Sequence, residues 1–221
     1  MIKAINLHKF YEELHVLKGV NLEIKKGEVI SIVGASGTGK TTLLQILGTL
    51  DSFSSTQEKS SLLIGGQDIK TLNQQQLAKF RNKNLGFVFQ FHQLLPEFSA
   101  LENICIPAYI GNTPKVTAEK KAKELLSFLN LSNRINHKPN ELSGGEQQRV
   151  AVARALINDP AIILADEPSG NLDTESAENL HNLFFKLRDE FGQTFVIVTH
   201  NNSLASMADR KLLMKDGIIL P

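Results

Sequence analysis

The stretch that decides the fold is VISIVGASGTGKTTLLQILG, residues 29–48. Residues 29–33 are mostly apolar and β-branched, as in a short strand that is buried on both faces. A glycine-rich turn follows, and residues 40–48 then favour a helix. The turn fits the pattern G-x-x-x-x-G-K-[ST], and it consists of Gly34, Ala35, Ser36, Gly37, Thr38, Gly39, Lys40 and Thr41.

This turn has the residue types that hold a phosphate group. Its glycines let backbone N–H groups approach phosphate oxygens closely, and the helix behind it directs the positive end of its dipole at the same anion. Lys40 supplies a positive charge for the β- and γ-phosphates, and the Thr41 hydroxyl is suited to ligate Mg²⁺. Because the pattern lies between an expected strand and an expected helix, we predict a nucleotide site here.

In its last third, the chain again alternates expected strands and expected helices. We expect strands at 161–165, 194–198 and 211–215, and helices at 174–191 and 203–208. This alternation predicts a parallel α/β core. Before residue 29 we expect a short strand at 21–24. Between residues 99 and 158 helical signals dominate, with capping boxes that pair Ser99 with Glu102 and Ser143 with Glu146.

Polar residues follow two of the expected strands and a strand-like run at 85–89. Asp166 and Glu167 come directly after one, at the edge of the sheet where α/β proteins bind ligands. Asp166 is suited to hold Mg²⁺ or its water shell, and Glu167 to orient or deprotonate an attacking water. His200 and Gln90 follow two other β-rich runs. Alone, His200 is more often structural, and the Gln90 amide is suited to touch both metal and water.

A second anion site is predicted at LSGGEQQR, residues 142–149. A capped helix start would explain Ser143 and Glu146, but glycines are poor helix formers and two of them stand in the first turn. Gly144 and Gly145 leave N–H groups exposed at a positive helix end. One chain with two phosphate sites and one glycine-rich loop suggests that the second site serves a neighbouring molecule.

The composition excludes several other classes of protein. The 221 residues carry 24 Lys and Arg against 23 Asp and Glu, so no basic field indicates a nucleic-acid partner. One cysteine, Cys105, excludes an internal disulfide framework and a Cys-rich zinc site. Neither a signal peptide nor an apolar stretch long enough to span a bilayer is evident. We expect a protein of the cytoplasm.

Taken in order, these motifs resemble the nucleotide-binding domain of ABC transporters over essentially the whole chain. The resemblance implies an α/β fold: a RecA-like P-loop NTPase core at 1–90 and 159–221 with an antiparallel β-subdomain, and an inserted α-helical subdomain at 91–158, all within one domain. It implies ATP and Mg²⁺ as ligands, and a head-to-tail dimer of two copies that encloses two ATP molecules.

The resemblance also implies roles for single residues. Glu167 is the expected catalytic base, His200 contacts the γ-phosphate, and Gln90 reports the nucleotide to the membrane partner. Thr41, Gln90 and Asp166 are the expected metal residues. Tyr11 matches an aromatic residue that stacks on adenine, although a tyrosine that simply packs beside a strand fits equally well. The other expected nucleotide contacts are Thr42, Ser143, Gly144, Gly145, Gln147 and Asp173.

Within the family, FQFHQLLPEFSALEN, residues 89–103, resembles the ATP-binding subunits of bacterial lipoprotein-releasing systems. MacB-type exporters and FtsE-type regulatory ATPases share LADEPSGNLD, residues 164–173, and remain alternatives, as does, less favoured, a soluble ABC ATPase acting on DNA or ribosomes. The resemblance implies that this chain lies at the cytoplasmic face of the inner membrane as a peripheral protein. Its partners would be separate transmembrane permease subunits, and a helix of these would contact Phe91, Leu94, Leu95 and Phe98. These four residues could instead pack the helical subdomain. Departures from the family are the segment 53–58, within an expected polar surface loop at 52–61, and Ser169 in place of threonine.

Overall fold

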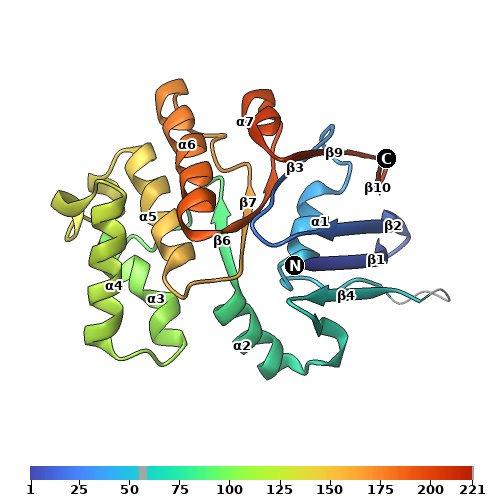
Figure 1. Ribbon diagram of the computed structural model, residues 1–221, viewed down its shortest axis with the longest axis horizontal. Helices are drawn as coiled ribbons and strands as arrows, with labels where there is room; N and C mark the ends of the chain where they lie inside the picture. Colours follow the sequence, from blue (N-terminus) through green and yellow to red (C-terminus); the bar gives the residue numbers. More distant parts are fainter. Residues whose placement is uncertain (55–58, 221) are drawn as a thin grey trace.

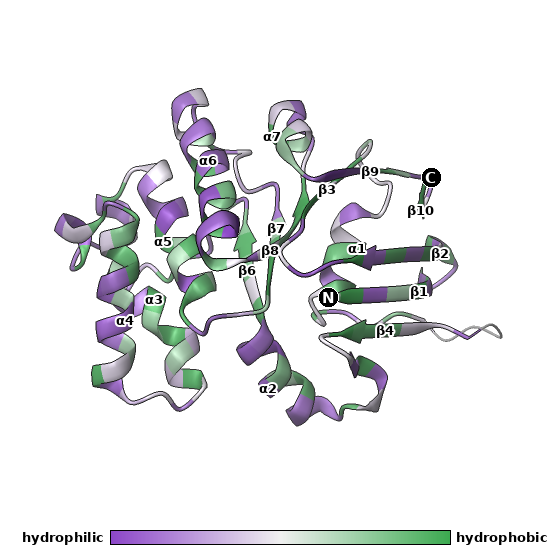
Figure 2. Ribbon diagram, in the orientation of Figure 1, coloured by the Kyte–Doolittle hydropathy of each residue, from purple (hydrophilic) through white to green (hydrophobic). Residues whose placement is uncertain are grey.

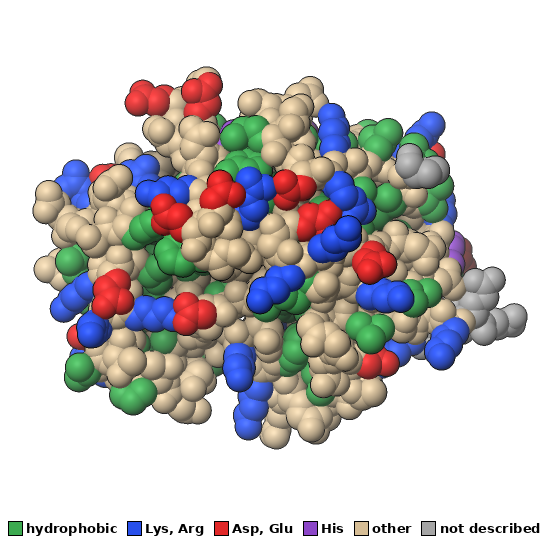
Figure 3. All heavy atoms as spheres, viewed as in Figure 1, with side chains coloured by type: hydrophobic (Ala, Val, Ile, Leu, Met, Phe, Trp, Pro, Cys, Tyr) green, Lys and Arg blue, Asp and Glu red, His purple; other side chains and the backbone are tan. Residues whose placement is uncertain are grey.

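A computed structural model describes residues 1–54 and 59–220, so residues 55–58 of the expected polar loop lie outside the described residues. The chain forms two sheets that lie side by side, with a group of helices at the opposite end of the molecule (Figure 1). This arrangement confirms the predicted α/β class with an antiparallel β-subdomain. On the face seen in Figure 3, acidic and basic side chains are interspersed.

The larger sheet positions the predicted site. Its strand order is β10-β9-β3-β8-β7-β6, and all neighbours except β10 and β9 run parallel. Asp166 at the end of β7 pairs with Phe89 of β6 and Val198 of β8, so these strands end at one level. The strands are β3 (Val29–Val33), β6 (Leu85–Phe89), β7 (Ile162–Asp166), β8 (Thr194–Val198), β9 (Arg210–Lys215) and β10 (Ile218–Ile219).

Both faces of this sheet are buried, which explains why its strands read as apolar runs. Along β7, Ile162 and Leu164 join a cluster with α1 (Lys40–Leu47) and the smaller sheet, whereas Ile163 and Ala165 face the opposite side. That side is covered by α5 (Gly144–Leu156), α6 (Thr174–Phe191) and α7 (Asn202–Met207). Figure 2 shows the central strands as hydrophobic ribbons between mixed helices.

The helices between β6 and β7 form a further apolar cluster. It joins α3 (Ala100–Ile110), α4 (Lys115–Phe128) and one side of α5, and it is centred on Ile104, Ala122 and Leu126. Helix α5 contributes Val152 to the core beneath the parallel sheet and Val150 to this second cluster. Because α5 packs against both clusters, the packing does not mark a boundary of the helical subdomain. The predicted boundaries at 91 and 158 therefore stay a prediction.

Both predicted capping boxes are confirmed. The Ser99 hydroxyl accepts from the N–H of Glu102, and the Ser143 hydroxyl accepts from the N–H of Glu146, with each glutamate carboxylate accepting from its serine N–H. Phe191, the last residue of α6, is exposed, and its ring meets the ring of Phe128 edge-on. The remaining helical segments are α2 (Gln74–Asn84) and three 3₁₀ turns, η1 (Ile69–Thr71), η2 (Ser132–Arg134) and η3 (Pro139–Glu141).

The smaller sheet extends well beyond the strand expected at 21–24, which is only the end of β2 (Leu14–Ile24). The order of this sheet is β2-β1-β4-β5, formed by β2, β1 (Ile2–Tyr11), β4 (Ser61–Ile64) and β5 (Gln67–Asp68). Asn6 and Gly19 have positive φ, and the register of β1 on β2 shifts between Ala4 and Leu7. Burial consequently changes phase along each strand, which hides the two-residue alternation that predicts strands.

Within residues 1–54 and 59–220, no helix combines the length and the apolar character that crossing a bilayer requires.

Candidate functional site

A cavity of about 480 Å³ lies at the edge of the parallel sheet where β3, β6, β7 and β8 end. Most of the residues predicted from the phosphate-binding turn and the strand ends line it. The lining residues are Val16, Gly34, Ser36, Gly37, Gly39, Lys40, Thr41, Thr42, Gln90, Asp166, Glu167, Val198 and His200. The fold therefore brings together, at one place, segments that are far apart in the sequence.

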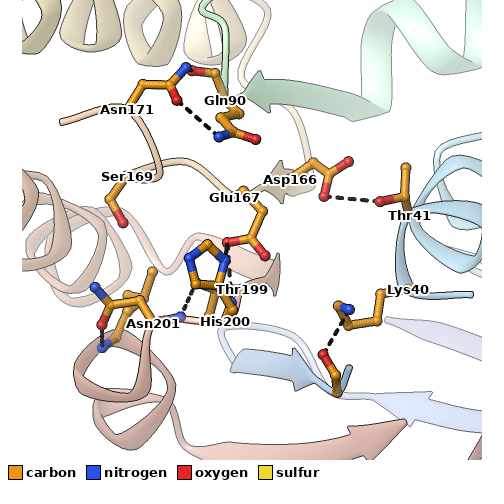
Figure 4. Close-up of polar contacts among 12 residues, drawn as sticks. Lys40, Thr41, Gln90, Asp166, Glu167, Ser169, Asn171, Thr199, His200 and Asn201 are labelled. Carbon is orange, nitrogen blue, oxygen red and sulfur yellow. Dashed lines mark hydrogen bonds and ion pairs between the residues drawn. The ribbon is translucent and has the colours of Figure 1, made fainter. Parts of the chain in front are cut away.

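The turn between β3 and α1 needs its glycines. A Cβ atom on Gly34 would lie 2.2 Å from the carbonyl oxygen of Met214, and Gly39, which caps α1, has a φ of 98° that side chains disfavour. The Nζ atom of Lys40 donates to the carbonyls of Gly34 and Ala35 at 2.9 and 2.8 Å. In Figure 4 the lysine lies opposite the carboxylates of the site. Its charge and the start of α1 thus face the same cavity.

Oxygen-bearing side chains converge beside Lys40. The Thr41 hydroxyl lies 3.4 Å from Oδ1 of Asp166 and donates to it, and Gln90 lines the same cavity (Figure 4). Burial raises the pKa of the Asp166 carboxyl, and the Thr41 hydrogen bond only partly offsets this. A half-buried carboxylate with a hydroxyl and an amide oxygen is the donor set that Mg²⁺ prefers. These residues fit a magnesium ion.

The side chains of Glu167 and His200 contact each other. Oε2 of Glu167 lies 2.9 Å from Nδ1 of His200 and accepts from the His200 backbone N–H at 3.1 Å (Figure 4). Glu167 has a φ of 45°, a left-handed backbone that is uncommon outside glycine, and its own N–H donates to the carbonyl of Val198. Such backbone strain is typical of functional positions, and it turns this carboxylate back toward the end of β8.

Gln90 takes part in a contact that sequence reasoning missed. Its Nε2 donates to Oδ1 of Asn171 at 3.0 Å, and Nδ2 of Asn171 donates to the Gln90 carbonyl at 3.2 Å (Figure 4). Gly170 makes room for this pair, since a Cβ atom there would lie 2.8 Å from Nε2 of Gln90. The available signal is Asn171 in the run at 164–173, because its side-chain amide can both donate and accept hydrogen bonds.

The predicted second anion site lies away from this cavity. Along the described parts of the chain, α5 contributes no lining residue to it. Ser143 and Gly144 are exposed at the start of α5, whereas Gly145 is buried against the Ser176 side chain, and the Gln147 amide donates to the carbonyl of Leu142. One chain therefore presents the serine and the first glycine outward, separate from the phosphate-binding turn.

Asp173 is likewise outside the cavity. It caps α6, and the hydrogen bond from the Ser176 backbone N–H holds the pKa of its carboxyl below the usual value.

Tyr11 also lies outside the lining of the cavity. Its hydroxyl donates to Oδ2 of Asp51 at 2.7 Å, and the Lys9 ammonium, which itself binds Oδ1 of Asp51, lies 4.8 Å from the centre of its ring. The ring is 44% exposed at the end of β1. The two interpretations of Tyr11, as adenine platform and as packed strand residue, both stay predictions.

The motifs of this chain match a known family. Residues 17–170 match the family model described as ABC transporter, and the chain belongs to this family of ATP-binding proteins. It is an ABC-type ATPase. At the level of individual relatives, it is 59% identical to the lipoprotein-releasing system ATP-binding protein LolD of Bacteroides thetaiotaomicron, with 99% of each chain covered. LolD of Shewanella frigidimarina is 50% identical, with 99% of this chain and 92% of the relative covered.

Among solved structures, the fold resembles the ATP-binding cassette MJ0796 in a dimer bound to ADP and Pi. The TM-score is 0.89 at 41% identity, covering 100% of this chain and 97% of the other. A second dimeric structure of MJ0796 matches with the same TM-score at 42% identity. These matches confirm the predicted ABC nucleotide-binding fold.

Proposed function

We propose that this chain is the ATP-hydrolysing subunit of a transporter that releases lipoproteins from the inner membrane. It works at the cytoplasmic face, as two copies bound to separate membrane-spanning subunits. The observation that carries the proposal is the incomplete site: one chain lines a cavity with the phosphate-binding turn, two carboxylates and a histidine, yet exposes Ser143 and Gly144 elsewhere. A second copy supplies the missing helix end.

The dimeric arrangement follows from the anion chemistry of the two parts. Lys40 and the start of α1 bind the β- and γ-phosphates from one side. The N-terminus of α5 in the second copy, opened by Ser143 and its two glycines, approaches the γ-phosphate from the other. The MJ0796 cassette, solved as a dimer with ADP and Pi, supports such a pairing. The complete site then forms only when ATP lies between the two copies, so ATP binding closes the dimer.

Hydrolysis needs positioning and charge stabilisation more than covalent chemistry. Glu167 orients and deprotonates the attacking water, and His200, already hydrogen-bonded to Glu167, contacts the γ-phosphate. Thr41, Asp166 and Gln90 are the residues that would hold Mg²⁺. When bound, Mg²⁺ neutralises the charge that develops on the phosphate oxygens. Loss of the γ-phosphate removes the anion that holds the second copy, and the dimer opens.

A groove supports the assignment to membrane subunits. A mostly apolar cavity of about 620 Å³ between α2, β6 and α3 is lined in part by Leu50, Phe87, Phe89 and Ile110. Phe91, Leu95 and Phe98 follow β6, lie outside the lining of this cavity, and are 75%, 44% and 41% exposed. An apolar helix from a membrane subunit fits such a surface. Leu94, by contrast, packs against the apolar cluster of α3 and α4.

The cargo assignment comes from the relatives named LolD, which are 50–59% identical over nearly the whole chain. The test is release of a labelled lipoprotein from inner-membrane vesicles that contain the membrane subunits and this protein. Wild-type protein should release the lipoprotein only with ATP. The MacB-type and FtsE-type alternatives predict an intact ATPase without lipoprotein release, and that result would refute the proposed cargo.

The catalytic assignment has a separate test. Glu167→Gln should bind ATP, form a stable dimer and hydrolyse ATP at least about a hundred-fold more slowly, because the general base is lost. Glu190→Gln is a matched control, since Glu190 is an exposed residue of α6 that contacts Lys186. Turnover by Glu167→Gln at the wild-type rate would remove Glu167 from its role. ATP-dependent dimers are measured by size-exclusion chromatography with light scattering.

A further inference from the structure

Gln148 is a buried polar residue to which the proposed mechanism gives no role. It lies near the start of α5, and its side chain has no exposed surface. Nε2 of Gln148 donates to the carbonyl of Pro168 at 2.7 Å and to that of Phe89 at 3.3 Å. Its Oε1 accepts a hydrogen bond from Nδ1 of His92. All three contacts reach segments outside α5.

These segments are the ones that hold the reacting groups. Pro168 directly follows Glu167, and Phe89 directly precedes Gln90. His92 belongs to the turn after Gln90. The first turn of α5 carries the residues predicted to meet the ATP of the second copy. A single amide group therefore connects the helix that senses the partner's nucleotide to the two loops that hold the base and the metal-facing glutamine.

The orientation of this amide is determined by its neighbours. Carbonyl oxygens only accept hydrogen bonds, so Nε2 of Gln148 must face Pro168 and Phe89, and Oε1 must face His92. Nδ1 of His92 then carries the hydrogen. The backbone of this turn is fixed to α5 as well, because Arg154 donates to the carbonyls of His92 and Gln93 at 2.7 and 2.6 Å.

We propose that Gln148, oriented by His92, is a positioning residue that aligns Glu167 and Gln90 with the start of α5. When α5 shifts as Ser143 meets the γ-phosphate in the second copy, the Gln148 amide carries the shift to the Pro168 carbonyl and hence to Glu167. The inference rests on the proposed function for the role of Glu167 as base, and it extends that function to how closure starts hydrolysis.

The first test replaces Gln148 with methionine, which has a similar volume and neither the donors nor the acceptor. Affinity for the fluorescent analogue MANT-ATP and KM for MgATP should stay within about two-fold, because the phosphate-binding turn is untouched. The kcat of the isolated protein should fall about ten- to hundred-fold, as expected for a misplaced base. A wild-type kcat in the folded variant would overturn the proposal. A parallel loss of ATP affinity would also overturn it, since that marks general damage.

The second test uses His92, whose φ is 54°. Asparagine tolerates this left-handed backbone and can donate to Oε1 of Gln148, whereas leucine cannot donate. His92→Leu should lower kcat about ten-fold, and His92→Asn should restore most of it. Gln93→Leu is the control, because Gln93 has a φ of 50° and contacts Arg154 through its backbone carbonyl. Gln93→Leu places a leucine in the same left-handed backbone region, and its kcat should stay within about two-fold of the wild-type value.

The two tests together decide the proposal even if Gln148→Met fails to fold, which circular dichroism would show. In that case, equal kcat values for His92→Leu and His92→Asn would overturn it. If Gln148→Met folds, the double variant with His92→Leu should be no slower than Gln148→Met alone, because both changes break one connection. Additive losses would contradict this. All assays use the isolated protein without membrane subunits or cargo, so failure of the lipoprotein cargo assignment would not affect them.

Discussion

At the scale of single residues, His181 shows how the fold controls the segment that follows Glu167. Its side chain is 2% exposed, and Nε2 lies 2.9 Å from Oγ of Ser169. Burial lowers the pKa of His181, which the charge of Glu178 only partly offsets. The imidazole is therefore neutral in the folded protein near neutral pH, and its contact with Ser169 anchors the loop that Gln148 contacts at Pro168.

This burial predicts a pH dependence of stability. As the pH falls below about 6.5, the usual histidine pKa, the unfolded chain takes up a proton at His181 while the folded chain does not. The free energy of unfolding should therefore fall with decreasing pH, until the pH passes below the lowered pKa of the folded protein. In His181→Phe this part of the fall should be absent. Urea unfolding between pH 7.5 and 5 measures it, and identical slopes for both proteins would contradict the expectation.

Gly170 gives a second prediction at this scale. In Gly170→Ala the new methyl group would lie 2.8 Å from Nε2 of Gln90 and would displace that side chain. We expect kcat to fall roughly ten-fold while MANT-ATP binding is retained, because Gln90 is a proposed metal residue and does not belong to the phosphate-binding turn. A kcat equal to that of the wild type would show that the position of Gln90 does not matter.

At the scale of elements, α3 and α5 begin with the same capping box but differ in what the cap is for. Ser99→Ala and Ser143→Ala should each destabilise the protein by about 1 kcal/mol, since each removes an N-cap hydrogen bond. Only Ser143→Ala should also lose ATP-dependent dimer formation, because its hydroxyl stands at the proposed partner surface. Thermal unfolding and light scattering with ATP compare the two. Equal dimer formation would remove Ser143 from the interface.

Strands could be predicted from the sequence where both of their faces are buried along the whole strand. Residues 29–33 and 194–198 are strands with the expected bounds, since each is buried on both faces and reads as an apolar run. The strand β1 was not predicted, because the bulge at Asn6 shifts the buried positions from Ile2 and Ala4 to Leu7. Local irregularity of this kind is set by pairing with β2, and no pattern within β1 contains it.

The site was predictable to the extent that its residues belong to contiguous motifs. Lys40, Asp166 and Glu167 each follow or adjoin a buried strand, so their convergence could be expected from a parallel sheet. The contacts of Gln148 could not, because they join α5 to two loops that lie far away in the sequence. Hydrogen bonds between distant loops depend on tertiary packing alone.

At the scale of the whole molecule, the separation of the two proposed anion sites predicts complementation. Lys40→Ala lacks the phosphate charge, and Ser143→Arg blocks the start of α5, so neither should hydrolyse ATP alone. A mixed dimer has one complete site, formed by Lys40 of one copy and Ser143 of the other. Equimolar mixing should restore roughly a quarter of the wild-type activity, from random pairing with one complete site per mixed dimer. No recovery on mixing would argue that each chain hydrolyses ATP by itself.

Helix α5 packs into the apolar core under the parallel sheet with Val152 and into the cluster of α3 and α4 with Val150. The segment with the helices is therefore not an independent module, because removing it would open the hydrophobic core of the remainder. Exchange of partner specificity between relatives should succeed when the junctions enclose the segment from Phe91 through α3, which carries proposed contacts with the membrane subunit, and leave α5 in place. Evolution can then vary which membrane protein is recognised while the machinery that reads ATP stays intact.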